Sequence, residues 1–290
     1  MKSGYVVITG KPNVGKSTLM NAIFKRKVSI VSYKPQTTRN QIKALLNTED
    51  SSIMFIDTPG YHESRNKLDT FLNSEIKGGY KMTNTAILLI DLTREIDDED
   101  KKVIQILKEY KIENIILVLT KQDIASKKHI GKYSGQIKEL INVKDVICIS
   151  SKNDENVNEL LNKIKEYLPD ADPISEAADE DDSFVISEIV REQVIFNTQK
   201  EVPYSTAVYV ESKKFEGGVF EINAVIVVEK ESQKPIIIGK GGQMIKKIGT
   251  YARKELLEIY DCRVNLKLFV KVEKDWRDNE RFLKETGYYK

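Results

Sequence analysis

Eight consecutive residues near the start of the chain have the types and spacing of a phosphate-binding loop. They follow an apolar run and have the order Gly10, Lys11, Pro12, Asn13, Val14, Gly15, Lys16 and Ser17. Glycines let backbone N–H groups point at a phosphate, and a helix that follows adds the positive end of its dipole. We expect Lys16 to contact the β- and γ-phosphates of a nucleotide and Ser17 to bind Mg²⁺, with Thr18 beside it.

A second polar group follows an apolar run further along the chain. It consists of Asp57, Thr58, Pro59 and Gly60. An aspartate at this position can hold Mg²⁺ through a coordinated water, and the glycine N–H can contact the γ-phosphate. Pro-Gly pairs also occur in ordinary turns, but the position after the phosphate loop favours a nucleotide site.

A third group predicts which base is bound, and it consists of Thr120, Lys121, Gln122 and Asp123. The Asp123 carboxylate can accept two hydrogen bonds from guanine, whereas adenine offers no such pair of donors. The stem of Lys121 can lie over the ring. A backbone N–H for the guanine oxygen is expected from Ser150, Ser151 or Lys152. The alternative, a P-loop kinase or ATPase, requires Asp123 to be incidental.

The elements that must position these groups alternate between short apolar runs and segments with helical spacing. Buried strands are predicted at Tyr5–Thr9, Ile53–Asp57, Ala86–Asp91, Ile115–Leu119 and Val146–Ile149. Helices are predicted at Ser17–Lys27, Ser64–Tyr80, Asp97–Tyr110, Ser126–Asn142 and Asn156–Tyr167. This alternation predicts an α/β domain with a mostly parallel sheet, and Gln41–Leu46 with Ser52–Ile56 predicts an antiparallel edge hairpin.

The pattern changes after residue 168. We assign residues 1–168 to the first domain, 169–183 to an acidic linker without basic residues, and 184–290 to a second domain. The second domain is predicted to have the order helix, strand, strand, helix, strand, helix. Its predicted elements are Phe184–Thr198, Thr206–Val210, Phe220–Val228, a helix that follows Gly242, Val264–Val272 and Trp276–Lys284.

Composition bounds the class of protein. The 290 residues suffice for two domains, and no apolar run of about 18 residues predicts a membrane span. The start of the chain is too polar for a signal peptide, so we expect a cytoplasmic protein. Cys148 and Cys262 fit core positions in a reducing compartment, and two histidines are too few for a histidine metal site. The net charge of +2 neither requires nor excludes nucleic acid.

The order of these motifs resembles the translation-factor-like class of GTPases, and one more segment narrows the resemblance. Pro35, Gln36, Thr37, Thr38 and Arg39 make it similar to the Era family, bacterial GTPases that act in assembly of the small ribosomal subunit. The resemblance implies GTP or GDP with Mg²⁺ as cofactors. It also implies that this segment is the first switch, in which Thr37 or Thr38 binds Mg²⁺; we favour Thr38. Thr120 departs from the family's usual asparagine.

The catalytic group is harder to assign. Many GTPases have a glutamine after the position of Gly60 to orient the attacking water, but here Tyr61 and His62 follow. A phenol lacks the separate N–H donor and C=O acceptor with which an amide orients a water, so slow intrinsic hydrolysis is expected. The resemblance implies that Asn13 helps to bind K⁺, which could stabilise developing charge together with Lys16, Thr38 and Gly60. His62 is either a solvated loop residue or a group that positions water.

Residues 236–249 resemble the signature of a KH domain, in the α+β type II form that follows the GTPase domain in Era. A Gly-x-x-Gly loop lets a nucleic-acid backbone approach closely, and nearby lysines can contact phosphates. The expected RNA-binding residues are Ile238, Gly239, Lys240, Gly241, Gly242, Lys246 and Lys247. A glycine pair alone often marks only a tight turn.

The resemblance implies that the ligand is the 3′ end of small-subunit ribosomal RNA and that the partner is the small ribosomal subunit. The alternative is a second domain that docks on a protein or a membrane. Peripheral association with the cell membrane is known in the family, and Lys267, Phe269 and Lys271 could serve it. We expect a monomer.

Overall fold

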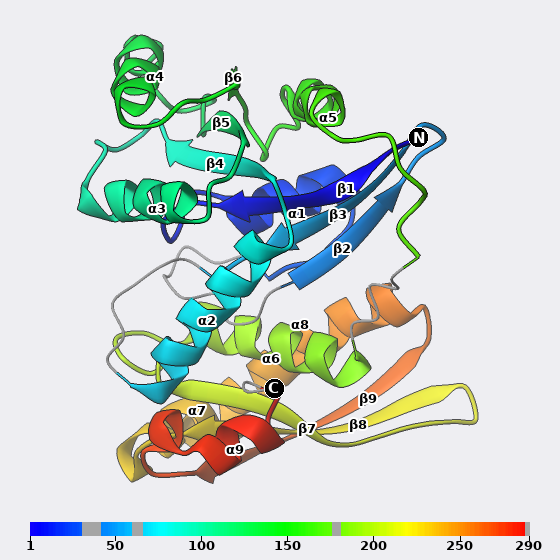
Figure 1. Ribbon diagram of the computed structural model, residues 1–290. Helices are drawn as coiled ribbons and strands as arrows, with labels where there is room; N and C mark the ends of the chain where they lie inside the picture. The colour runs from blue at the N-terminus through cyan, green and yellow to red at the C-terminus, as the bar shows by residue number, and fades with distance from the viewer. Residues whose placement is uncertain (31–41, 60–65, 176–180, 288–290) are drawn as a thin grey trace. The chain divides into compact units, whose positions relative to one another are not determined.

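The computed structural model describes residues 1–30, 42–59, 66–175 and 181–287. They form two compact units, each with its own sheet (Figure 1). Among the described residues, the first unit consists of residues up to 59 and 69–175, and the second consists of 66–68 and 181–287.

The first unit contains a six-stranded sheet in the order β2-β3-β1-β4-β5-β6. Neighbouring strands are parallel, except that β2 is antiparallel to β3. The bounds are β1 Lys2–Thr9, β2 Ile42–Asn47, β3 Ser51–Asp57, β4 Thr85–Asp91, β5 Asn114–Thr120 and β6 Asp145–Cys148. The predicted parallel sheet and its edge hairpin are therefore confirmed.

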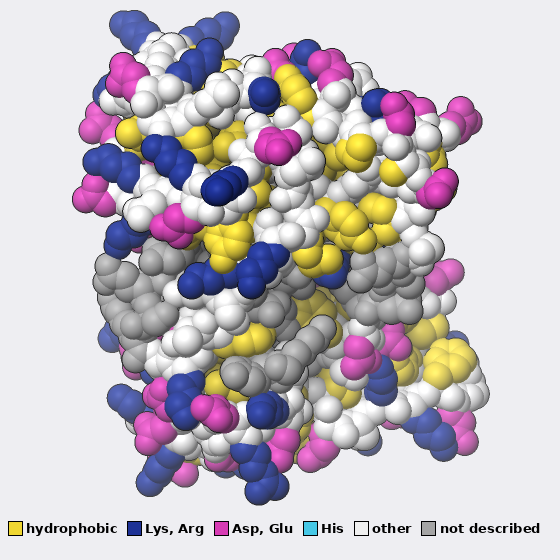
Figure 2. All heavy atoms as spheres, viewed as in Figure 1, with side chains coloured by type: hydrophobic (Ala, Val, Ile, Leu, Met, Phe, Trp, Pro, Cys, Tyr) yellow, Lys and Arg dark blue, Asp and Glu magenta, His cyan; other side chains and the backbone are white. Residues whose placement is uncertain are grey.

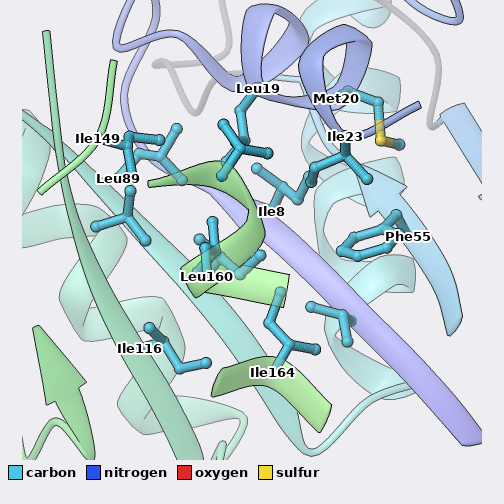
Figure 3. Close-up of a cluster of buried hydrophobic side chains, with 14 of the residues drawn as sticks. Ile8, Leu19, Met20, Ile23, Phe55, Leu89, Ile116, Ile149, Leu160 and Ile164 are labelled. Atoms are coloured by element: carbon cyan, nitrogen blue, oxygen red, sulfur yellow. The ribbon is translucent and has the colours of Figure 1, made fainter. Parts of the chain in front are cut away.

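Helices cover both faces of this sheet. They are α1 Lys16–Phe24, α2 Lys67–Lys81, α3 Asp98–Glu109, α4 Lys128–Leu140 and α5 Val157–Glu166. Side chains from α1 and α5, such as Leu19 and Leu160, pack on one face against Ile8 and Phe55 (Figure 3). Helices α3 and α4 pack on the other face. Because the strands are covered on both faces, they appear in the sequence as continuous apolar runs.

This topology places the predicted site at one edge of the sheet. β1, β3 and β5 are parallel, so the segments that follow Thr9, Asp57 and Thr120 leave the sheet at the same edge. Open α/β sheets bind ligands at the carboxyl ends of their strands. The three motifs, far apart in the sequence, thus meet in space.

The second unit contains a three-stranded sheet in the order β7-β8-β9, in which β8 is antiparallel to β7 and parallel to β9. The bounds are α6 Asp182–Asn197, β7 Thr206–Glu216, β8 Val219–Val228, α7 Lys234–Ile238, α8 Gln243–Tyr260, β9 Arg263–Val272 and α9 Glu280–Glu285. Helices α6 and α8 pack on the sheet around a core that includes Ile189 and Ala252. Trp276, the one tryptophan of the chain, is buried, and its Nε1 donates to the Ser205 carbonyl at 3.0 Å.

Two elements of the second unit differ from the predicted order. Helix α7 was not among the predicted elements, because five residues are too few to show a helical period. Strand β7 extends to Glu216, beyond the predicted end at Val210. The prediction ended too early because an irregularity between Val210 and Ser212 interrupts the alternation of side chains.

The first residues of the predicted linker lie on the first unit. Ser3 N–H donates to the Pro169 carbonyl, and Ala171 N–H donates to the Met1 carbonyl, both at 3.0 Å. The physical reason is that β1 begins four residues before its pairing with β4 starts at Val6, which leaves backbone groups to satisfy. Ile174 packs on the core of the same unit.

No helix in the described ranges is both long and apolar enough to cross a membrane. Figure 2 shows Lys and Arg side chains interspersed with Asp and Glu on the face in view, in keeping with the nearly balanced composition.

Candidate nucleotide site and nucleic-acid interface

The phosphate loop takes a conformation that requires its glycines. Gly10 has a φ of 152°, and a Cβ atom there would lie 2.8 Å from the Leu89 carbonyl oxygen. Gly15 has a φ of 108° and precedes α1, whose first turn has no side-chain cap. The loop therefore packs closely on β4 and presents the N-terminus of a helix, as phosphate binding requires.

Lys16 lies across this loop. Its Nζ donates to the carbonyl of Gly10 at 2.9 Å and to that of Lys11 at 3.0 Å, and the side chain is buried. Burial lowers the pKa of Lys16 to about 8, although the charge of Asp57 opposes this shift. The lysine is held where it can contact phosphate oxygens.

Asp57 provides an orphaned buried oxygen beside the loop. Its Oδ2 accepts hydrogen bonds from the hydroxyls of Ser17 at 2.9 Å and Ser29 at 3.2 Å. Its Oδ1 is buried and has no hydrogen-bond partner among the described residues. Burial raises the pKa of Asp57 to about 6, against the effect of Lys16 and the two hydroxyls. Mg²⁺ prefers oxygen ligands and keeps several of its waters, so a buried carboxylate oxygen without a hydrogen-bond partner fits a hydrated Mg²⁺ ion.

Two residues of this region, Asn21 and Ser29, were not predicted from the sequence. The Asn21 Oδ1 accepts from the N–H groups of Val28 at 2.8 Å and Ser29 at 2.9 Å. Its Nδ2 donates to the Ser29 carbonyl at 2.8 Å. Asn21 thus holds the chain in the position that brings the Ser29 hydroxyl to Asp57. An asparagine inside a helix, where its propensity is poor, is the signal that could have indicated it.

The base-selecting segment contacts the phosphate loop directly. Thr120 Oγ1 donates to the Val14 carbonyl at 2.8 Å, and Lys121 Nζ donates to the Asn13 carbonyl at 3.1 Å. Asp123 is exposed at the start of the loop that follows β5, where a bound base can reach it. The structure therefore brings Thr120 and Lys121 together with the phosphate loop.

The segment after β6 narrows the choice of backbone donor. Ser150 N–H donates to the Glu155 carbonyl at 3.2 Å, and Glu155 N–H returns a bond to Ser150 at 2.9 Å. Because the Ser150 donor is already engaged, the N–H groups of Ser151 and Lys152 are the better candidates for the guanine oxygen.

The side chain of Lys11, a residue of the predicted phosphate loop, forms ion pairs with two aspartates at the start of α3. It is 1% exposed, and its Nζ lies 2.5 Å from Asp97 Oδ2 and 2.7 Å from Asp100 Oδ2. The ammonium is paired away from the loop interior, because a buried charge needs such partners. Only the backbone of Lys11 can face a phosphate.

Several predicted site residues lie outside the described residues. They are Pro35, Gln36, Thr37, Thr38 and Arg39 of the first switch, together with Gly60, Tyr61 and His62.

The glycine loop of the second unit connects α7 to α8. Gly239 has a φ of 74°, and a Cβ atom there would lie 2.6 Å from Met244 Cβ, so only glycine fits. Gly241 has a φ of 57° and open space around its Cβ position. Three of the predicted lysines beside the loop are exposed: Lys240, Lys246 and Lys247. Ile238 is half-buried. This is the shape that close approach of a nucleic-acid backbone requires.

Comparison with known proteins agrees with both units. A model of the 50S ribosome-binding GTPase family matches residues 5–121, and a KH domain model matches residues 201–277. The solved structure of an Aquifex aeolicus Era variant bound to GDP and AlF4⁻ has a TM-score of 0.95 and 34% identity, over 100% of both chains. Fold and site define a P-loop GTPase domain joined to a KH domain.

Full-length relatives identify the family. GTPase Era of Ureaplasma parvum is 47% identical over 99% of this chain and 98% of its own length. GTPase Era of Caldicellulosiruptor saccharolyticus is 43% identical over 99% and 97%. The chain belongs to the GTPase Era family. An Era structure solved with MgGDPNP and nucleotides 1506–1542 of 16S ribosomal RNA matches 100% of the chain at a TM-score of 0.94 and 35% identity.

Proposed function

We propose that this protein is a GTP-hydrolysing switch that binds the 3′ end of small-subunit ribosomal RNA during assembly of the small ribosomal subunit. The observation that carries the proposal is the presence, in one chain, of a phosphate loop with its buried Lys16 and of the Gly239–Gly242 loop with its exposed lysines. The similarity to Era solved with 16S ribosomal RNA over the whole chain supports it.

At the nucleotide, the N–H groups of the phosphate loop and Lys16 bind the β- and γ-phosphates, which requires the loop conformation set by Gly10 and Gly15. Ser17 and Thr38 would hold Mg²⁺, and Asp57 would accept a hydrogen bond from a water bound to the ion. Bound Mg²⁺ supplies neutralisation of the charge that develops on the phosphates. Gly60 contacts the γ-phosphate. Water attacks the γ-phosphorus of GTP, the bond from that phosphorus to the β,γ-bridging oxygen breaks, and GDP and phosphate are released.

At the base, Asp123 accepts from the two guanine donors and Lys121 covers the ring. Ser151 or Lys152 donates a backbone N–H to the guanine oxygen. Thr120 takes the place of the usual asparagine through its bond to the Val14 carbonyl. A measurable consequence is strong preference for guanine over adenine nucleotides, because a carboxylate finds no donor pair on adenine.

We propose that Asn13 would help to hold K⁺, which would stabilise the charge that develops on the phosphates as an arginine finger does in other GTPases. Asn13 lies in the loop with a φ of 64°, in the left-handed region, and its carbonyl accepts a hydrogen bond from Lys121 Nζ at 3.1 Å. Hydrolysis rates measured in K⁺ and Na⁺ buffers of equal ionic strength test this assignment. A rate that is the same in both buffers would remove it.

RNA binding is tested with a short single-stranded RNA that ends like the 3′ end of small-subunit ribosomal RNA, in the presence of GDP or GDPNP. We expect binding that depends on the nucleotide, because the γ-phosphate orders Thr38 and Gly60. Equal RNA binding with GDP and with GDPNP would support the RNA-binding function but contradict the proposed coupling between nucleotide and RNA binding. Absence of binding would favour a docking surface around Phe269, which is half exposed between Lys267 and Lys271.

A matched pair of variants sharpens this test. Gly241→Asp adds a negative charge to the glycine loop, and Gly217→Asp adds one to the turn between β7 and β8. The two glycines have φ values of 57° and 58°, and neither Cβ position has a neighbour within 4 Å. Backbone strain is therefore equal, so RNA binding lost only in Gly241→Asp assigns the loop. Cytoplasmic location and a monomeric state remain predictions.

A further inference from the structure

The carbonyls of two consecutive phosphate-loop residues are held by cationic side chains from other segments. Arg94 Nη2 donates to the Pro12 carbonyl at 2.9 Å, and Lys121 Nζ donates to the Asn13 carbonyl at 3.1 Å. Both cations also meet the carboxylate of Asp91. Its Oδ2 lies 2.6 Å from Lys121 Nζ and 3.5 Å from Arg94 Nε.

Asp91 is well placed to organise this cluster. It ends β4, its side chain is 2% exposed, and its Oδ1 accepts from the N–H of Thr93 at 2.9 Å and from the hydroxyl of Thr93 at 2.6 Å. Burial disfavours the charged carboxylate, but the hydrogen bonds from Lys121 and Thr93 outweigh it and keep the pKa of Asp91 below its ordinary value. Both carboxylate oxygens are thus occupied, and the side chain has one arrangement.

The geometry explains why the carbonyls matter. In a trans peptide the C=O points opposite to the N–H, so a peptide unit whose N–H faces a phosphate has a carbonyl that faces away from it. Outward carbonyls in a buried loop need donors, and Arg94 and Lys121 are those donors for Pro12 and Asn13. Lys11, which precedes Pro12 in the loop, is held in turn by ion pairs of its side chain with Asp97 and Asp100.

We infer that Asp91 and Arg94 are positioning residues that raise the affinity for guanine nucleotide by fixing the phosphate loop and the base-covering Lys121 in one arrangement. This role rests on the proposed nucleotide site. In this role Asp91 and Arg94 act through Pro12, Asn13 and Lys121. The carboxylate of Asp91 links the phosphate end of the site to the base end.

The test measures dissociation of a fluorescent GDP from the full chain with Mg²⁺. Asp91→Asn keeps the shape of the side chain and removes its charge, and Arg94→Gln removes the fork that reaches Pro12. We expect each variant to release GDP about tenfold faster than the parent. Preference for guanine over adenine nucleotides should be unchanged, because Asp123 is untouched. Glu95→Gln is the matched control, since the exposed Glu95 carboxylate forms its ion pair with Lys132, at 2.9 Å, and not with Asp91, Arg94 or Lys121.

The double variant separates positioning from general destabilisation. Because Asp91 and Arg94 act through one arrangement, their combined effect on GDP release should be smaller than the product of the single effects. GDP release from the single variants at rates within about twofold of the parent would overturn the inference. A fall in melting temperature that is equal with and without GDP would not rescue it, because such a fall reports general destabilisation. A parent protein that binds no GDP would overturn the proposed nucleotide site itself, and the inference with it.

Discussion

Asp57 illustrates how a single residue reports its ligand. A buried carboxylate with two hydroxyl donors on one oxygen and none on the other is costly without a cation nearby. Lys16 supplies part of the compensation, and a hydrated Mg²⁺ would supply the rest. The Oδ1 atom without a hydrogen-bond partner in the described part of the chain is therefore the observation that supports the proposed Mg²⁺ beside Asp57.

The first prediction follows for Asp57→Asn. The amide cannot hold the water of Mg²⁺ as a carboxylate does, so GDP should dissociate about ten- to a hundredfold faster in Mg²⁺. Chelation of Mg²⁺ should accelerate release from the parent but not from this variant. Asp98→Asn, at an exposed position on α3, is the control. A variant that still responds fully to chelation would show that Asp57 is not in the metal site.

A second prediction at this scale contrasts two glycines. Gly10→Ala should lower the free energy of unfolding by about 1–3 kcal/mol, because its Cβ would collide with the Leu89 carbonyl. Gly135→Ala, at an exposed helical position of α4 with open space, should raise it by about 0.5–1 kcal/mol. Denaturant titration of both variants measures the two signs. Equal effects would contradict the close packing of Gly10 on β4.

Elements of structure carry the next level of explanation, and α1 does more than end the phosphate loop. Through Asn21 it also fixes residues 28 and 29, so one helix positions Lys16, Ser17 and Ser29 around Asp57. The spacing of Ser17 and Asn21 by one helical turn makes this possible.

The third prediction concerns that contact. Asn21→Ala removes three hydrogen bonds and leaves buried backbone groups unsatisfied, so the free energy of unfolding should fall by about 1–3 kcal/mol. Faster GDP release should accompany it, since Ser29 would leave Asp57. Asn223→Ala on β8, which removes one exposed hydrogen bond to Ser212 on β7, should change stability by less than about 0.5 kcal/mol. If both variants unfold alike, Asn21 has no special role.

The sequence predicted elements that repeat a simple pattern. The central residues of strands β1, β3, β4 and β5 form continuous apolar runs because they are buried on both faces, and the alternation in β9 reflects one face that is more buried than the other. Helix α7 escaped prediction because five residues show no period. The partners of Lys11 and Asp91 escaped it because they lie in other elements, and only the tertiary fold brings them together. The motif residues could be predicted because each motif is a short run of consecutive residues in the sequence.

At the scale of the whole molecule, the chain has two units with separate cores. Isoleucines and valines of the second core come entirely from residues after 185, and those of the first from residues before 175. Such units can unfold separately, because each buries its own apolar surface. A ligand stabilises only the state that binds it, by RT ln(1 + [L]/Kd).

The fourth prediction is therefore a split response to nucleotide. Mg²⁺ and GDP at about one hundred times the Kd should stabilise the first unit by roughly 2.7 kcal/mol. The second unit should gain less, and differential scanning calorimetry of the full chain should separate the two transitions. Two transitions that shift upward together would show that the units unfold as one.

The burial of Trp276 gives this experiment an internal probe. As the chain has a single tryptophan, and its indole donates to Ser205 within the second unit, intrinsic emission at long excitation wavelength reports that unit alone. Circular dichroism reports the helices of both. Comparison of the fluorescence and circular dichroism melting curves of one unlabelled sample therefore separates the melting of the nucleotide-binding unit from that of the second unit. The buried position of Trp276 makes this optical separation possible.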